Sequence, residues 1–253
     1  MSIIIFNEKQ INVQLCFICF LLRIKELKER GTTLKGIIFD FNGTMVFDAH
    51  LHERAWVEMI QHHNNEATEE EIIAYIHGRT NDKTIAHFIG EVTAKEQQEL
   101  SDEKEKEYQR LVRKEGLDYV AGTEELLDEL VKREIPFTIA TASPEINIDF
   151  YFDYFKLARW FKREEIIFDD GTFPGKPDPT IYERAAASLH LEPEECIVIE
   201  DAIAGIQSAN RAGIGKVVAM LHAKEQEKNI KDEDLAVDEF IWDFNDFLQD
   251  HFD

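Results

Sequence analysis

The sequence is poor in cysteine, proline and glycine: its 253 residues include 3 Cys, 6 Pro and 12 Gly. So few cysteines exclude a disulfide framework, and a reducing cytoplasm is the expected compartment. The low proline and glycine content, beside 44% hydrophobic residues, excludes a collagen-like or disordered chain. A chain of this length can form one large domain, or one domain that carries an insertion.

Basic residues are also scarce, with 28 Lys and Arg against 51 Asp and Glu and a net charge of −23. Binding to nucleic acid or to an anionic membrane needs clustered basic side chains, so we expect neither partner. The longest apolar run, Leu15–Leu22, is far shorter than the roughly 20 residues of a membrane span. A basic start and a small-residue cleavage site are missing as well, so we expect no signal peptide. The acid excess suits a protein that recruits cations.

Residues 1–34 differ from the rest, because they carry a net charge of +2 and leave −25 for the remaining chain. Cys16 and Cys19 form a C-x-x-C pair, but no second Cys/His pair lies nearby to complete a zinc site. We interpret this segment as an N-terminal extension. In one interpretation, native translation begins at the codon for Leu34 and this segment comes from an upstream start. In the other, the segment is part of the native protein and its apolar side chains need a partner.

From residue 35 the pattern alternates strands with helices. Short apolar runs followed by turn signals predict buried parallel strands; they are 36–39, 136–140, 166–168, 196–199 and 216–219. Helical patterns lie between them, at 123–134, 179–189 and 204–212, and we expect a closing helix over 240–253. Alternating elements of this kind form a parallel sheet covered by helices on both faces.

A block of helical patterns without strands interrupts this alternation after the first strand; it comprises 48–63, 68–77, 81–90 and 93–115. The stretch from Thr68 to Glu71 has the form of a capping box. The sequence therefore predicts an α/β fold with a Rossmann-like parallel sheet core and an inserted all-helical cap domain. We expect the core to span 35–47 and 119–253, and the cap to span 48–118.

Chemically active side chains follow the predicted strands. Asp40 ends the first strand, Thr141-Ala142-Ser143 ends the second, Lys176 lies in a loop before a helix, and Glu200-Asp201 ends the fourth. Because the carboxyl ends of parallel strands share one edge, these groups should meet there. Carboxylates for a divalent cation, a hydroxyl, a lysine and a nucleophilic aspartate suit phosphoryl transfer.

Four motifs in order resemble the haloacid dehalogenase superfamily, in its branch of beta-phosphoglucomutase and small sugar-phosphate phosphatases. They are the stretch from Ile37 through Asp40-Phe41-Asn42-Gly43-Thr44, the Thr141 motif, Gly175-Lys176-Pro177, and Glu200-Asp201 followed by Gly205-Ile206. Taken singly, each has an ordinary explanation as a turn, a helix cap or a solvated charge. Taken together and in order, they favour the resemblance, which covers 36–220.

The resemblance implies a role for each matching residue. Asp40 is the expected nucleophile, and Mg²⁺ is the expected cofactor, held by Asp40, the backbone carbonyl of Asn42 and Asp201, with Glu200 acting directly or through water. Thr141 and Lys176 would hold the phosphoryl oxygens and complete the catalytic set with Asp40 and Asn42. The expected substrate-binding residues are Gly43, Thr44, His52, Arg79, Ala142 and Ser143.

The candidates in the cap have competing explanations. His52 belongs to a stretch that looks like the family's H-x-x-A-W helix, and Arg79 to its G-R pair, but both could equally be surface groups on amphipathic helices. The histidine pairs His50/His52 and His62/His63 could suggest a transition metal. Solvated helix faces explain these histidines better than a metal does.

Asn42 departs from the family motif, which has a second Asp at this position. That Asp protonates the leaving group, whereas an amide has no proton to exchange near neutral pH. The loss of a positioned acid–base group typically costs about 10²–10⁴ in rate. Four explanations stay open: a slow or leaving-group-restricted phosphatase, an engineered substitution, a binding or regulatory protein, and deamidation of the Asn42-Gly43 dipeptide to Asp.

We therefore expect a Mg²⁺-dependent phosphatase that acts on a small phosphorylated metabolite of sugar or polyol size. The alternatives are a beta-phosphoglucomutase-type mutase, a phosphate-binding protein and a metal-independent dehalogenase. Pro144 and Glu145 stand where the mutase has a Lys-Asn pair, which disfavours the mutase. Glu200 and Asp201 would repel Asp40 without a cation, which disfavours the dehalogenase. A monomer is the default expectation for the oligomeric state.

Overall fold

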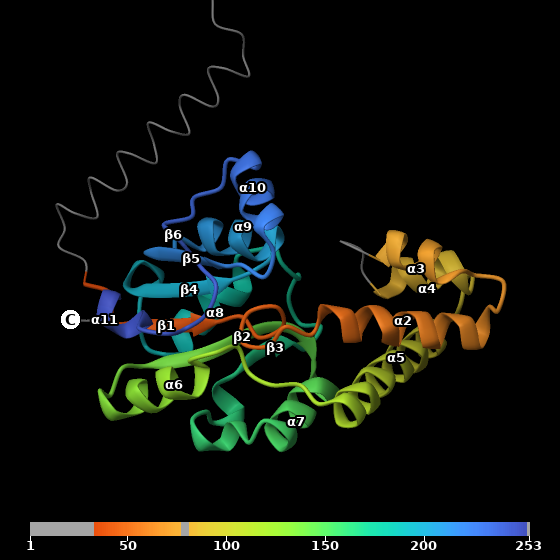
Figure 1. Ribbon diagram of the computed structural model, residues 1–253, viewed down its shortest axis with the longest axis horizontal. Helices are drawn as coiled ribbons and strands as arrows, with labels where there is room; N and C mark the ends of the chain where they lie inside the picture. The colour runs from red at the N-terminus through yellow and green to blue at the C-terminus, as the bar shows by residue number, and fades with distance from the viewer. Residues whose placement is uncertain (1–32, 77–80, 252–253) are drawn as a thin grey trace, which may run out of the picture.

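Figure 1 shows the computed structural model of the chain, which describes residues 33–76 and 81–251. A six-stranded sheet crosses the described part of the chain, in the order β3-β2-β1-β4-β5-β6, and every neighbouring pair is parallel. The strands are β1 (Gly36–Phe39), β2 (Phe137–Pro144), β3 (Ile167–Asp169), β4 (Cys196–Glu200), β5 (Lys216–Met220) and β6 (Glu239–Ile241). The predicted α/β class with a parallel sheet is confirmed.

Four helices of the described residues, here called the cap helices, directly follow β1 in the chain and lie to one side of the sheet in Figure 1. They are α2 (Ala49–His63), α3 (Glu69–Ile76), α4 (Asn81–Phe88) and α5 (Ala94–Glu115). The predicted capping box before α3 is present: the N–H of Thr68 donates to Glu71 at 3.0 Å, and the N–H of Glu71 donates back to the Thr68 hydroxyl at 3.3 Å.

The remaining helices cover the two faces of the sheet. They are α6 (Thr123–Lys132), α7 (Glu145–Tyr154), α8 (Thr180–Ser188), α9 (Ile203–Ala212), α10 (Lys224–Asp232) and α11 (Phe247–His251), with short 3₁₀ turns at Leu157–Arg159, Arg163–Glu165 and Pro193–Glu195. In Figure 1, α6 and α7 lie on one side of the sheet and α9 and α10 on the other. The sequence analysis did not predict α7 and α10.

The expected closing helix over 240–253 is wrong at its start. Residues 239–241 form β6, because Glu239 pairs with Val218 of β5 and Ile241 pairs with Met220. A helix appears only at Phe247–His251. So short an edge strand shows no alternating pattern of its own, and its pairing with the neighbouring strand decides its conformation.

The hydrophobic core consists of one cluster on each face of the sheet and a smaller cluster among the cap helices. On one face of the sheet, side chains such as Phe39 of β1 pack with residues of α6 and α7, including Tyr151. On the other face, side chains such as Val198 of β4 pack with residues of α8 and α9, including Tyr182. A smaller cluster around Ile60 holds the cap helices together. None of the helices in the described ranges is long and apolar enough to cross a bilayer.

Candidate active site

Three carboxylates meet where β1 and β4 end. The two strands pair in register, with Phe39 beside Ile199, so that Asp40 leaves one strand next to the end of the other. The backbone N–H of Asp40 donates to the carbonyl of Ile199 at 2.9 Å. One carboxylate oxygen each from Asp40, Glu200 and Asp201 lie within 4.8 Å of one another. The shared edge that the sequence predicted is therefore present at these residues.

Lys176 joins two of these carboxylates. Its Nζ donates to Oδ1 of Asp40 at 2.6 Å and to Oε2 of Glu200 at 2.8 Å. Burial alone would lower the pKa of Lys176, but the charges of Asp40 and Glu200 raise it well above its ordinary value. Burial raises the pKa of Asp40 well above its ordinary value, and Glu200 adds to this rise. Since one ammonium faces three carboxyl groups, the site keeps an affinity for further positive charge.

Glu200 and Asp201 differ in how their oxygens are used. Oε2 of Glu200 also accepts from the Tyr182 hydroxyl at 2.6 Å, and its Oε1 accepts from the N–H of Ala202 at 3.1 Å. The carboxylate of Asp201 has a longer contact, 3.4 Å to Nε2 of His222. Asp201 is therefore the carboxylate better placed to face an ion, while Glu200 holds Lys176 and Tyr182. Sequence reasoning missed Tyr182, because a single tyrosine inside a helix belongs to no motif.

Two glycines allow the backbone to approach these carboxylates. A Cβ on Gly43 would lie 2.3 Å from Oδ2 of Asp201, and the φ of Gly43 is +80°, which disfavours other residues. A Cβ on Gly205 would lie 2.0 Å from the carboxyl carbon of Glu200. Thr44, expected to bind substrate, is fully buried, and its hydroxyl makes no hydrogen bond to any described residue.

The side chain of Asn42 sits in a closed set of hydrogen bonds. Its Nδ2 donates to Oδ2 of Asp48 at 2.6 Å and to the Tyr151 hydroxyl at 2.8 Å. Its Oδ1 accepts from the Ser143 hydroxyl at 2.6 Å and, more weakly, from Thr141 at 3.4 Å. An ionised carboxylate only accepts hydrogen bonds, so Asp48 determines which end of the amide is the NH₂ group. Asn42 is thus held in one orientation by groups on both sides.

Asp48 is a site residue that the sequence analysis missed. It stands at the N-cap position of α2, yet its side chain makes no capping hydrogen bond and turns towards Asn42 instead. It also accepts from the Tyr108 hydroxyl at 2.6 Å and lies 3.3 Å from Nε2 of His52. Burial acts to raise the pKa of Asp48, but these hydrogen bonds outweigh burial and lower that pKa. An acid before a helix is normally interpreted as a cap, which hid its role.

His52 links this network to the cap. Its ring stacks on Tyr108 with centroids 3.8 Å apart, and its Nδ1 lies 2.8 Å from Nζ of Lys104. Lys104 in turn pairs with Glu105 at 3.0 Å, and Glu105 accepts from Asn147 at 2.7 Å. Lys104 and Glu105 are only 4% exposed, which is rare for charged residues. The cap therefore presents a buried, hydrogen-bonded polar wall beside the carboxylates.

A cavity of about 720 Å³ separates the sheet edge from this wall. The predicted site residues that line it are Asp40, Asn42, His52, Thr141, Ala142, Ser143, Lys176, Glu200 and Asp201. Its further polar lining, not predicted, comes mostly from the cap and includes Asn81, Gln97, Ser101, Lys104, Glu105 and Asn147. Arg79 lies outside the described residues. The cavity is large enough for a small metabolite, and both ends offer polar contacts.

A parallel sheet with carboxylates and a lysine at its carboxyl edge, facing a polar cavity below inserted helices, is the architecture of an α/β enzyme. The haloacid dehalogenase-like hydrolase family matches residues 34–213. The chain therefore belongs to the haloacid dehalogenase-like hydrolases.

Individual relatives agree with this assignment. Hexitol phosphatase A of Escherichia coli (strain K12) is 32% identical over 180 residues, which cover 71% of this chain and 80% of the relative. Beta-phosphoglucomutase of Bacillus subtilis (strain 168) is 30% identical over 190 residues, covering 72% and 81%. A solved structure, a HAD hydrolase of family IA, variant 3, from Entamoeba histolytica, superposes with a TM-score of 0.75 at 34% identity, covering 84% of this chain and 94% of that one. The resemblance predicted from the motifs is confirmed.

Proposed function

We propose that this protein is a Mg²⁺-dependent phosphatase that acts on small sugar or polyol phosphates through an aspartyl-phosphate on Asp40. The observation that carries the proposal is the floor of the cavity, where Lys176 lies 2.6 Å from Asp40 and beside the carboxylates of Glu200 and Asp201. The names of the relatives, hexitol phosphatase A and beta-phosphoglucomutase, support this substrate class.

The donor set fits a magnesium ion. Mg²⁺ prefers oxygen ligands, usually one or two carboxylates with water and substrate phosphate. The side chains of Asp40 and Asp201 and the backbone carbonyl of Asn42 would hold the ion, and the close approach of Gly43 to Asp201 leaves no side chain in the way. When bound, the ion would neutralise charge on the phosphoryl group and on the carboxylates.

The protein's own residues account for the chemistry. A carboxylate oxygen of Asp40 attacks phosphorus, and the bond from phosphorus to the sugar oxygen breaks. The departing oxygen takes a proton from a water molecule, so that the sugar leaves as an alcohol and hydroxide remains. Water then cleaves the acyl phosphate, which releases phosphate and restores Asp40. Lys176 keeps Asp40 oriented and offsets negative charge. Thr141, near the end of β2, has only a long 3.4 Å contact to Asn42 and offers its hydroxyl at the same edge for the phosphoryl oxygens.

Asn42 sets the expected rate. An amide donates hydrogen bonds to fixed partners but supplies no proton to a leaving alcohol. We therefore propose that turnover is slow for phosphates whose leaving group is an ordinary sugar hydroxyl and faster for substrates with more acidic leaving groups. The cap, for which we propose the bounds 48–118, supplies the polar wall that recognises hydroxyl groups.

The decisive experiment measures phosphate release from a panel of hexose, pentose and polyol phosphates, with and without Mg²⁺. It compares the wild type with Asp40→Asn and with Asp153→Asn, a control acid whose side chain is 73% exposed. We expect release only with Mg²⁺, a loss of at least about 10³-fold in Asp40→Asn, and no change in the control. Undiminished activity of Asp40→Asn would refute the nucleophile.

The same panel separates the alternatives. Conversion of one sugar phosphate into an isomer without phosphate release would identify a mutase. Mg²⁺ and phosphate binding without turnover of any substrate would identify a binding protein. Metal-independent chloride release from 2-haloacids would identify a dehalogenase.

A further inference from the structure

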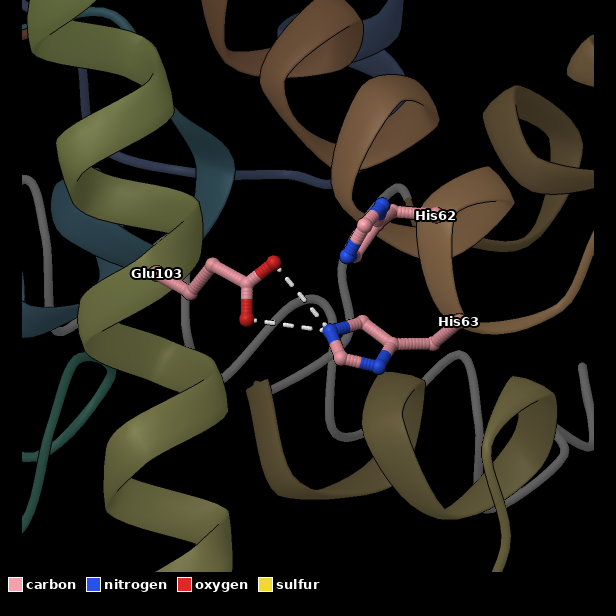
Figure 2. A group of neighbouring side chains, drawn as sticks. All are labelled: His62, His63 and Glu103. Atoms are coloured by element: carbon pink, nitrogen blue, oxygen red, sulfur yellow. Dashed lines mark hydrogen bonds and ion pairs between the residues drawn. The ribbon is translucent and has the colours of Figure 1, made fainter.

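A second cluster of potential metal ligands lies on the cap helices, apart from the carboxylates at the sheet edge. Figure 2 shows His62 and His63, in the last turn of α2, facing Glu103 of α5. One ligand atom from each lies within 4.8 Å of the other two. The described residues contain two groups of potential metal ligands. The one at the sheet edge consists of carboxylates, whereas this one combines two imidazoles with a carboxylate.

The distances suit a small divalent ion. The Nε2 of His63 lies 3.1 and 3.0 Å from the two carboxylate oxygens of Glu103. Zinc binds imidazole nitrogen and carboxylate oxygen at about 2.0–2.2 Å, which puts neighbouring ligand atoms of a tetrahedral site roughly 3.3 Å apart. His63 and Glu103 already have this spacing. His62 is exposed, so its ring can turn through the remaining distance without disturbing the core.

The electrostatic surroundings favour a cation. The last turn of a helix carries partial negative charge from its free carbonyl groups, and the net charge of the chain is −23. Lys106 and Arg110 line the same 450 Å³ hollow as His62 and Glu103. Lys106 is exposed and its ammonium can extend into solvent, and Arg110 is already paired with Glu58 and Glu107. Two imidazoles with one carboxylate select transition metals, whereas Mg²⁺ and Ca²⁺ prefer all-oxygen sites.

We propose that His62, His63 and Glu103 form a binding site for one divalent transition-metal ion of the zinc type. The ion joins the end of α2 to α5 and so cross-links two cap helices. Three protein ligands leave a fourth position for water. This site is independent of the proposed phosphatase, because none of its residues lines the catalytic cavity.

The test uses the full, tag-free chain, stripped with chelator and returned to buffer with excess Mg²⁺ to occupy the carboxylate cluster. Zn²⁺ is titrated by calorimetry, and Co²⁺ by its visible absorption bands. The variants are His63→Gln and Glu103→Gln. The matched control is His50→Gln, an exposed histidine at the start of the same helix.

We expect the wild type and the control to bind one equivalent with micromolar affinity, and each variant at the site to bind at least tenfold more weakly. Zn²⁺ should also raise the melting temperature of the wild type but not that of His63→Gln. Equal affinity in wild type and His63→Gln, or binding only at millimolar metal, would overturn the proposal. A Co²⁺–thiolate band that disappears in Cys16→Ser/Cys19→Ser would assign the metal to those cysteines instead and would also overturn it.

Discussion

At the scale of single residues, Asn42 and Asp48 form a reciprocal pair. Position 42, which carries an acid in the family motif, is a neutral amide here. This amide donates a hydrogen bond to the carboxylate of Asp48 at 2.6 Å. Two carboxylates at this distance would repel, and one of them would take up a proton. The two identities are therefore coupled, and neither can be exchanged alone without cost.

This coupling predicts the outcome of restoring the acid. Asn42→Asp alone should gain little phosphatase activity and lose stability, because the introduced carboxylate would face that of Asp48. The double variant Asn42→Asp/Asp48→Asn should recover the hydrogen bond and raise kcat by about 10²-fold or more. Steady-state kinetics and urea unfolding of the two single variants and the double variant, treated as a cycle, measure the coupling. Additive effects of the two substitutions would show that the pair is not coupled.

Gly43 is a second position where one residue controls the site. Gly43→Ala should cost about 1–2 kcal/mol of stability from its left-handed backbone, and should also push Asp201 away from the ion position. The matched control is Gly116→Ala, since Gly116 has a φ of +83° but open space around its Cβ. Both variants should lose stability on unfolding. Only Gly43→Ala should need at least tenfold more Mg²⁺ for half-maximal activity, and an equal Mg²⁺ requirement in both would contradict the close-approach argument.

At the scale of elements, α5 combines two kinds of surface. Most of this densely charged helix is solvated, but Lys104 and Glu105 turn inward beside His52 and Asn147. Burial would raise the pKa of Glu105, but Lys104, His52 and the hydrogen bond from Asn147 outweigh burial and lower that pKa. The helix therefore contributes both a soluble outer face and a charged inner wall to the cavity.

Removal of the buried charge should destabilise the protein strongly. Glu105→Gln leaves Lys104 without its counter-charge and should lower the free energy of unfolding by about 3 kcal/mol. Glu99→Gln, on the same helix and in an exposed pair with Lys95, should change it by less than about 1 kcal/mol. Chemical denaturation at pH 7 checks both variants, and equal small effects would refute the buried pair.

The pH dependence of this difference has a definite sign. The contribution of Glu105 is fully present above the pKa of an unfolded Glu, about 4.3, and is lost as the pH falls towards its lower pKa in the folded chain. The difference in the free energy of unfolding between wild type and Glu105→Gln should therefore become smaller as the pH falls below about 4.3.

At the scale of the whole molecule, the sheet and the residues Asp40, Asn42, Thr141 and Lys176 of the proposed site all follow residue 33, and the family match begins at residue 34. A variant that starts at residue 34, after an added Met, should therefore keep its melting temperature within about 2 °C and its kcat/KM within twofold. Calorimetry and the phosphatase assay compare it with the full chain. A large loss of either property would show that residues 1–33 stabilise the fold or complete the site.

The local pattern of the sequence determined the first five strands, most of the helices and the residues at the strand ends. Apolar runs and turn signals act over a few residues, and parallel strands share one edge, so Asp40, Lys176 and Glu200 could be placed together in advance. The same local rules missed α7 and α10. They also assigned residues 240 and 241 to the closing helix, although pairing with β5 makes them part of a strand.

Only the tertiary structure decided which side chains touch across elements. No sequence pattern singled out Asp48, Tyr182 or Lys104, yet all three hydrogen-bond into the candidate site. Their roles depend on strand register and on how α5 packs against α2, which involve residues far apart in the chain. Contacts over such distances come from packing and burial, and no short sequence pattern encodes them.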